Sequence, residues 1–152
     1  MNVPSNIRYY DLRHVTGHAT LIDIDNGVVE AAGTSFFNKA VLRVLGCKGW
    51  GLLGIDNFDP DKRQDFGDLL HSASRLASIT QQDVALADAL HNPLPVPAMR
   101  EDPRAVSLEE KTGILGGIER AAALPGIVNR RANYIERAEK IVFSDSSGTE
   151  LS

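Results

Sequence analysis

Residues 36–56 read FFNKAVLRVLGCKGWGLLGID, and this stretch decides the expected fold. Two apolar runs flank the short turn sequence GCKG at residues 46–49, so the pattern predicts a β-hairpin. Gly51 and Gly54 interrupt the second run. Glycine weakens a strand and often marks a bulge or the close approach of another backbone. We therefore expect these glycines to mark either the close approach of a helix or another backbone segment, or a bulge.

Short antiparallel strands are expected upstream of this hairpin. Alternating or β-branched sequence on either side of Thr16-Gly17 indicates two strands joined by a turn. Asn26-Gly27 is the strongest hairpin signal in the chain, because it supplies both positive-φ positions of a type I′ turn. Residues 33–35 (GTS) then break the pattern. The strands expected here cover residues 7–15, 20–25 and 28–32.

Two amphipathic helices are predicted downstream. Asp59 and Pro60 suit the N-cap and first position of a helix that ends near Ser78. Ser107 and Glu110 form a capping box that opens the second helix. The apolar faces would consist of Phe66, Leu69, Leu70, Ala73, Leu76 and Ala77 in the first helix and Ile114, Leu115, Ile118 and Ala122 in the second. Gly113, Gly116 and Gly117 weaken the second helix, and close packing against the sheet would explain them.

The remaining segments are less regular. Residues 83–89 suggest a short helix or an irregular segment, and residues 91–103 a proline-bearing covering loop. Strand-like sequence returns at 127–134 and 141–143, on either side of a charged stretch that could hold a turn. Residues 149–152 resemble the start of another strand that is cut off, which suggests a truncated chain.

Separate groups of strands and helices predict the α+β class. We expect a mainly antiparallel sheet with a central β-hairpin, two principal helices packed on it, and C-terminal strands. A length of 152 residues suits a single domain spanning residues 1–152.

Composition excludes several classes of function. A net charge of −4 argues against a nucleic-acid binder, since such domains are usually basic. The N-terminus has no signal-peptide pattern, and no run of apolar residues is long enough to span a membrane. The only cysteine, Cys47, cannot form an internal disulfide, so a reducing cytoplasmic location is expected.

Few residues suggest chemistry. His14 and His18 are four apart, but a turn is expected between them, so ordinary histidines are favoured over a metal site. Cys47 beside Lys48 could be a reactive thiol, yet it lacks an assigned histidine partner. The carboxylates of Asp23 and Asp25 are expected on a solvated face. No catalytic, cofactor-binding or metal-binding residue is therefore predicted.

Charged residues outside these candidates leave one alternative open. Arg43 lies inside the apolar run VLRVL, so it either points to a solvated face or forms a buried or interfacial ion pair. Arg130, Arg131 and Arg137 form the only basic cluster, and Glu136 and Glu139 interrupt it. That mixture does not suit a nucleic-acid surface.

Several short stretches, taken in order along the chain, resemble one family. They are YDLR at 10–13, GVVE at 27–30, VLRV at 41–44, GWG at 49–51, the helix at 69–77, SLEEK at 107–111 and the turn SDSSGTE within 141–150. Together they resemble the N-terminal domain of the TldD/PmbA family of metallopeptidases, once called modulators of DNA gyrase. Residues 36–39 (FFNK) depart from the glycine-rich run that the family usually has there.

The resemblance implies a full-length zinc peptidase whose HExxxH motif lies outside this domain, in a two-subunit shell that encloses peptide substrates. The chain contains no such motif, so no family site residue can be transferred to it, and zinc is expected in the catalytic part only. We expect a non-catalytic domain, inactive alone, that shapes the cavity and contacts a homodimeric or heterodimeric partner subunit, with neither nucleic acid nor membrane bound. The alternative is a stand-alone interaction module that regulates or pairs with a full-length peptidase. A small enzyme using Cys47 or His14 and His18 is the least favoured.

Overall fold

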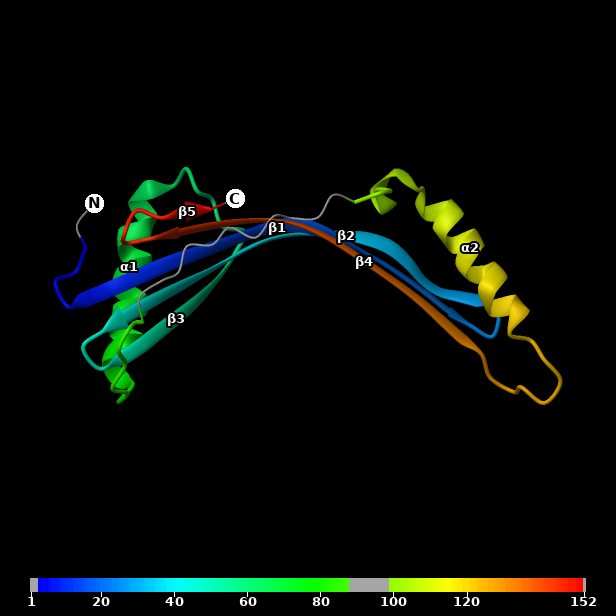
Figure 1. Cartoon of the computed structure of the whole chain (residues 1–152), viewed down its shortest axis with the longest axis horizontal. Helices are drawn as coiled ribbons and strands as arrows, with labels where there is room; N and C mark the ends of the chain where they lie inside the picture. Colours follow the sequence, from blue (N-terminus) through cyan, green and yellow to red (C-terminus); the bar gives the residue numbers. More distant parts are fainter. Residues whose placement is uncertain (1–2, 88–98, 152) are drawn as a thin grey trace. The chain divides into compact units, whose positions relative to one another are not determined.

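The computed structural model describes residues 3–87 and 99–151, apart from the side chains of residues 63–65. A five-stranded sheet with the order β3-β2-β1-β4-β5 carries two helices, α1 and α2 (Figure 1). The elements are β1 (Ile7–Asp25), β2 (Val28–Gly46), β3 (Gly49–Asp56), α1 (Arg63–Ile79), the 3₁₀ helix η1 (Pro103–Ala105), α2 (Leu108–Ala121), β4 (Arg131–Asp145) and β5 (Glu150–Leu151). The predicted α+β class with an antiparallel sheet is confirmed.

The first two strands are much longer than predicted. β1 runs straight through Thr16-Gly17, and β2 runs through residues 33–35, so the turn and the break expected there are wrong. Neither Gly17 nor Gly33 has a positive φ, so the backbone stays extended at both. The hairpin at Asn26-Gly27 is confirmed, with φ of 47° and 81°.

The C-terminal strand is also continuous. β4 includes the charged residues 135–140, where a turn was expected, and residues 127–130 precede it without strand structure. The charges fit a strand because successive side chains alternate between its faces. Residues 83–87 form no helix, and the rest of the predicted segment 83–89, together with most of the proline-bearing loop, lies outside the described residues.

The chain divides into two compact units. Unit 1 comprises Met1–Gly17, Phe37–Leu90 and Glu139–Ser152, and unit 2 comprises His18–Phe36 and His91–Ala138. The strands β1, β2 and β4 contribute residues to both units. The expectation of a single domain stays a prediction, and each unit is described by itself below.

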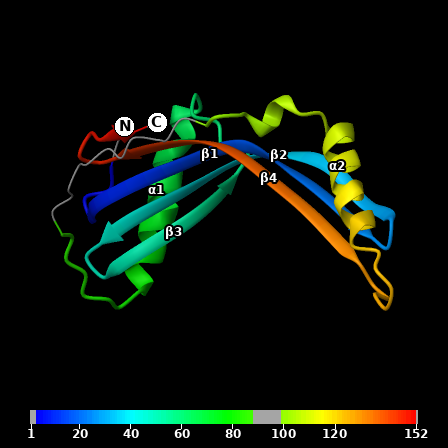
Figure 2. The same ribbon diagram turned by 45° about the vertical axis from the view of Figure 1, so that its right-hand side comes forward.

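In unit 1, α1 lies against the sheet (Figure 2), and an apolar core fills the space between them. Its buried residues are Leu42, Val44, Leu70 and Ala73. A Cβ at Gly51 would lie 2.0 Å from the carbonyl oxygen of Ala73, so only glycine lets α1 approach β3 this closely. The expected close approach is therefore confirmed at Gly51, whereas nothing lies within 4 Å of a Cβ at Gly54.

The start of α1 differs from the prediction. The helix begins at Arg63, and its N-cap residue, Lys62, makes no capping hydrogen bond with its side chain. Asp59 instead accepts a hydrogen bond from the backbone N–H of Asp61 through Oδ1, at 3.0 Å. This local turn occupies the aspartate that would otherwise cap the helix.

Unit 2 packs α2 against the ends of the β1–β2 hairpin and against β4. Its apolar core is small and consists of Ile22, Ile24 and Leu115. The predicted N-cap is confirmed, because the Ser107 hydroxyl accepts a hydrogen bond from the N–H of Glu110 at 3.1 Å. No helix in the described part of the chain is long and apolar enough to cross a membrane.

Candidate functional site: a buried charge cluster beside α2

The buried face of α2 is not the one its isoleucines predict. The residues that point inward are Lys111, Leu115 and Glu119, which follow one another at intervals of four. Ile114 and Ile118 are 57% and 61% exposed, so the predicted apolar face is wrong at both. A helix can bury charged residues in this way only when partners neutralise them.

The partner of Lys111 is Glu136 on β4. The Lys111 Nζ donates to Glu136 Oε2 at 2.6 Å, and only 9% and 7% of the two side chains are exposed. The Tyr134 hydroxyl donates to the same oxygen at 2.7 Å. The Lys111 ammonium also lies 5.7 Å from the centre of the Tyr134 ring, within the range of a cation–π contact.

These contacts keep Glu136 ionised. The hydrogen bond from Lys111, followed by the one from Tyr134, lowers the pKa of Glu136, although burial opposes the shift. The hydrogen bond between Tyr134 and Glu136 also raises the pKa of the Tyr134 hydroxyl. A general acid or base needs a pKa near the operating pH, so this arrangement suits fixed charge and positioning better than proton transfer.

A pocket of ≈ 350 Å³ opens beside the cluster. His18 lines it with its Nε2 atom 3.9 Å from Glu136 Oε1. Arg104 also lines it, and its Nε donates to Asp102 Oδ1 at 2.8 Å. That hydrogen bond lowers the pKa of Asp102 to about 2. The Arg104, Lys111 and Glu136 charges that line the pocket are thus already paired.

The predicted basic cluster is divided between separate partners in unit 2. Arg130 Nε donates to Glu119 Oε1 at 2.8 Å, and Arg131 Nε donates to Asp23 Oδ1 at 3.0 Å. The bond from Arg131 lowers the pKa of Asp23. Asp23 lies beside the exposed Arg131, and pairing with that arginine leaves 15% of the Asp23 side chain exposed.

Arg43 in unit 1 is both partly solvated and ion-paired, so the two alternatives left open for it are combined. Its Nε and Nη2 atoms donate to Asp11 Oδ1 and Oδ2 at 2.9 and 2.8 Å. The aspartate is 2% exposed, whereas the arginine side chain is 47% exposed and lies 5.2 Å above the Trp50 ring. Both residues line a ≈ 440 Å³ pocket.

The remaining candidates are not brought together. His14 Nε2 lies 2.8 Å from Asn38 Oδ1 in unit 1, whereas His18 lines the pocket in unit 2. Cys47 is exposed in the β2–β3 turn. Among the described residues, no group of three or more His, Cys, Asp or Glu side chains could hold a metal ion. These residues therefore do not fit the zinc site that the resemblance implies for a full-length protein.

Sequence reasoning missed the cluster of Lys111, Tyr134 and Glu136. One signal was present: the capping box fixes where α2 begins, and Lys111, Leu115 and Glu119 then share one face at i, i+4 and i+8. Choosing between that face and the one of the isoleucines requires knowing that β4 supplies Glu136.

Comparison with known proteins shows where this fold occurs. No protein-family model matches the sequence, and no curated protein matches it. A proposed modulator of DNA gyrase from Thermotoga maritima matches 94% of this chain with a TM-score of 0.68 and 12% identity. A second one, from Bacteroides thetaiotaomicron, matches 96% of it with a TM-score of 0.70 and 10% identity. TldE from Thermococcus kodakarensis matches 95% with a TM-score of 0.68 and 15% identity.

At these identities the matches establish the fold, and they confirm the resemblance to TldD/PmbA-family structures at that level. The chain spans about a third of each matched protein: 32%, 34% and 33% of the three chains. The shared fold therefore corresponds to one part of those longer proteins.

Proposed function

We propose that this chain acts as a non-catalytic domain of a TldD/PmbA-like zinc peptidase, where it shapes the substrate cavity and the contact between subunits. The observation that carries the proposal is the fold match, which covers nearly all of this chain but about a third of each matched structure. A domain of this kind provides surfaces and leaves the chemistry to another part of the protein.

The charge arrangement supports the same role. Glu136 has a lowered pKa because Lys111 and Tyr134 hold its ionised form, which favours structural use over acid–base catalysis. The exposed Ile114 and Ile118 give α2 an outward apolar surface that suits contact with another subunit. In this proposal the zinc ion belongs to the catalytic part, and the partner is a homologous subunit.

Zinc content and peptide hydrolysis test the proposal. Chain 1–152 is purified with added zinc, and bound zinc and cleavage of a fluorogenic peptide library are measured. The expected result is neither stoichiometric zinc nor turnover. The gene is then read past the codon for Ser152, and we expect a continuing frame with HExxxH whose inclusion produces zinc-dependent hydrolysis. Stoichiometric zinc and cleavage by chain 1–152 alone would overturn the proposal, and a stop codon directly after Ser152 would favour the stand-alone interaction module.

A further inference from the structure

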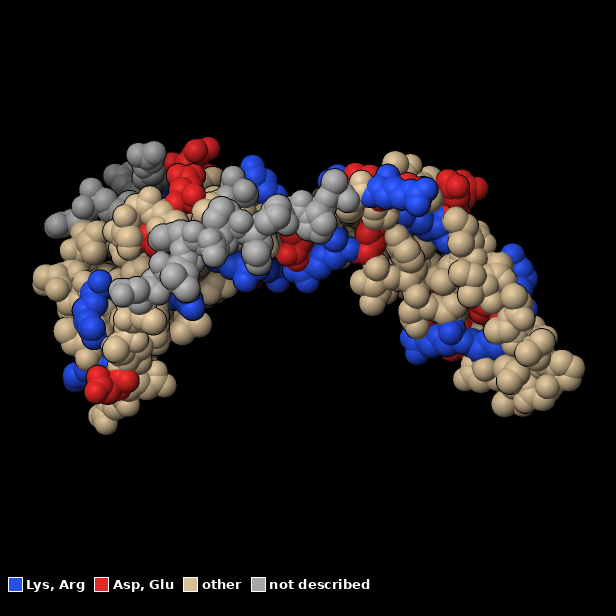
Figure 3. Space-filling model, in the orientation of Figure 1, with Lys and Arg blue, Asp and Glu red and all other residues tan. Residues whose placement is uncertain are grey.

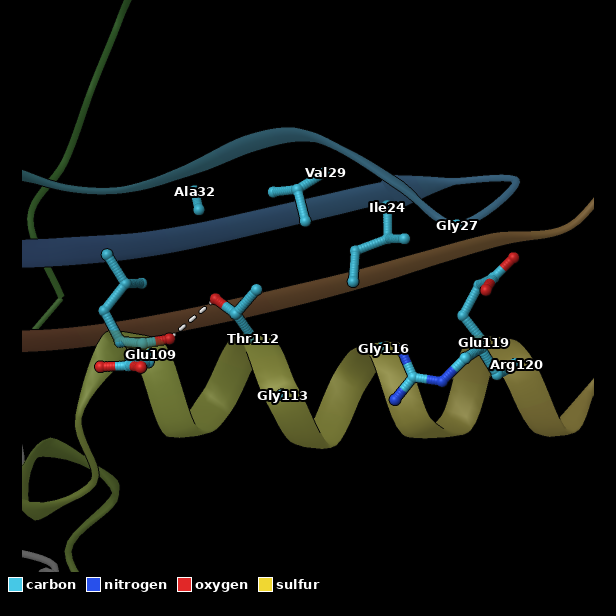
Figure 4. A pocket seen from close by; sticks show the side chains of 11 residues that line it. Ile24, Gly27, Val29, Ala32, Glu109, Thr112, Gly113, Gly116, Glu119 and Arg120 are labelled. Carbon is cyan, nitrogen blue, oxygen red and sulfur yellow. Dashed lines mark hydrogen bonds between the residues drawn. The ribbon is translucent and has the colours of Figure 1, made fainter.

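A second cavity in unit 2 lies between α2 and the start of β2. This groove has a volume of ≈ 640 Å³. Figure 4 shows Ile24, Val29 and Ala32 pointing from the strands toward α2. Thr112, Gly113 and Gly116 face them from the helix. The middle of the groove is therefore lined by small and apolar groups, as in most ligand-binding clefts.

The glycines of α2 leave the floor of this groove open. Nothing lies within 4 Å of a Cβ placed on Gly113, and a Cβ on Gly116 would meet Arg120 Nη1 at 3.2 Å and Ile24 Cδ1 at 3.8 Å. Close packing against the sheet, the reason expected for these glycines, is therefore wrong for Gly113. It is also wrong for Gly117, around which there is open space. Gly113 keeps space free beside the sheet at a cost in helix stability of about 1 kcal/mol.

One wall of the groove is an unpaired strand edge. β3 pairs with β2 only from Lys39 to Gly46, and β1 occupies the other side of β2. In the described part of the chain, no strand covers the outer edge of residues 28–36, and these residues are all exposed. An exposed edge offers a row of backbone donors and acceptors to an incoming extended segment.

A buried carboxylate lies at the end of the groove. Glu119 lines it and points from α2 toward the turn at Gly27 (Figure 4). Arg130 satisfies Oε1, but Oε2 is buried and has no hydrogen-bond partner. Only 1% of the Glu119 side chain is exposed, so this oxygen is shielded from bulk solvent. Leaving such an oxygen unpaired costs about 1–3 kcal/mol or more.

Arg120 does not supply the missing donor. Its guanidinium folds back over Gly116, along the side of the groove (Figure 4). A donor that enters along the groove approaches Glu119, because this residue lines it. A basic side chain fits this position, because it supplies both a hydrogen bond and the opposite charge.

We propose that this groove binds an extended peptide segment, which adds to the free edge of β2 as another strand. The segment places small or apolar side chains against Ile24 and α2 and directs one Lys or Arg side chain to Glu119. The unpaired edge accounts for the extended conformation, and the unsatisfied carboxylate accounts for the basic residue. This binding site does not depend on the peptidase role proposed above.

Selection from a random decapeptide phage library tests the proposal. The library is panned on the whole chain, and an enriched peptide is synthesised, labelled and titrated by fluorescence anisotropy. We expect enriched sequences that alternate apolar residues and contain a Lys or Arg. N-methylation of alternate peptide nitrogens should weaken binding at least about tenfold, because it blocks pairing to a strand edge. No enrichment, or enrichment without a basic residue, would overturn the proposal.

Matched variants locate the binding site. Gly113→Leu fills the groove, whereas Gly117→Leu changes the same helix at a position that does not line it. Binding should fall at least about tenfold in the first and stay unchanged in the second, with both variants folded because each replaces an unfavourable helix residue. Equal affinity in the two variants would overturn the site.

The Glu119→Gln variant tests the basic contact. It should reduce affinity for the selected peptide about tenfold or more, while the peptide with norleucine in place of its basic residue should bind both forms alike. Glu110→Gln changes an exposed carboxylate of the same helix that does not line the groove, and it serves as the control. Sedimentation of the free chain completes the test. Concentration-dependent dimers that Gly113→Leu abolishes would assign the groove to a second copy and overturn the peptide proposal.

Discussion

Unit 1 and unit 2 both pack one helix against antiparallel strands, but they bury different kinds of side chain. Unit 1 buries Leu42, Val44 and Leu70 completely. Unit 2 has a smaller apolar core and buries Lys111 and Glu136 as an ion pair beside it. Unit 1 also buries the carboxylate of Asp11, but its partner Arg43 is half-exposed, whereas both members of the pair in unit 2 are buried. Unit 1 therefore relies mainly on apolar burial, which is non-directional, and unit 2 more on contacts that require specific partners.

This difference in buried side chains determines how a substitution in each unit lowers its stability. Removing one apolar group leaves a cavity, whereas removing one member of a buried ion pair leaves an uncompensated charge. Replacing both members by apolar residues can be neutral or even stabilising. Figure 3 shows basic and acidic side chains near one another on the displayed face, but exposed pairs of that kind contribute little.

The largest expected effect comes from breaking the buried pair in unit 2. Lys111→Met should lower the free energy of unfolding of that unit by about 3–5 kcal/mol, because Glu136 is left buried without its cation. Native-state hydrogen exchange at the amides of α2 measures the loss. Trp50 is the only tryptophan and lies in unit 1, so its fluorescence follows the other unit separately.

Two controls show whether burial is the cause. Lys111→Met combined with Glu136→Leu should recover most of the lost stability. Lys39→Met removes one member of an exposed pair with Asp56, whose side chains are 66% and 80% exposed, and should change little. If the double variant were as unstable as Lys111→Met, the uncompensated charge of Glu136 would not be the cause of the lost stability.

A smaller effect is expected from crowding the interface between α1 and β3 in unit 1. In Gly51→Ala the new methyl group would lie 2.0 Å from the Ala73 carbonyl oxygen, so the helix must move. We expect a loss of about 2–3 kcal/mol. Gly54→Ala, in the same strand, meets nothing within 4 Å and should be tolerated. Trp50 fluorescence during urea unfolding compares the two, and equal stability would contradict the close approach.

The smallest effect is the dependence of unit 2 on pH. The lowered pKa of Glu136 means that its contribution to stability is fully present above the unfolded-state pKa of about 4.3 and is lost as pH falls through the folded-state value. Urea titrations between neutral pH and about pH 3, followed at the Leu115 methyl resonances, measure this loss. Glu136→Gln should flatten the profile. An unchanged profile would assign the acid sensitivity to other carboxylates.

Features that depend on neighbouring residues could be predicted from the sequence, whereas features that depend on distant residues could not. The Asn26-Gly27 turn and the Ser107 cap follow from residues next to each other in sequence, and both are confirmed. Thr16-Gly17 suggested a turn because glycine favours turns in general, yet strand pairing keeps that segment extended. The inward face of α2 depends on Glu136, which is 25 residues from Lys111, so no local pattern reveals it.

The large sequence separation between β1 and its neighbour β4 has a consequence for synthesis on the ribosome. β1 lies between β2, which follows it directly, and β4, which begins only at Arg131. The N–H of Ser146 bonds to the carbonyl of Tyr10, 136 residues earlier. The β1–β2–β3 meander can therefore pair early, while the opposite edge of β1 stays open until most of the chain has emerged. Such distant pairing is slow, and the nascent chain exposes an unpaired edge meanwhile.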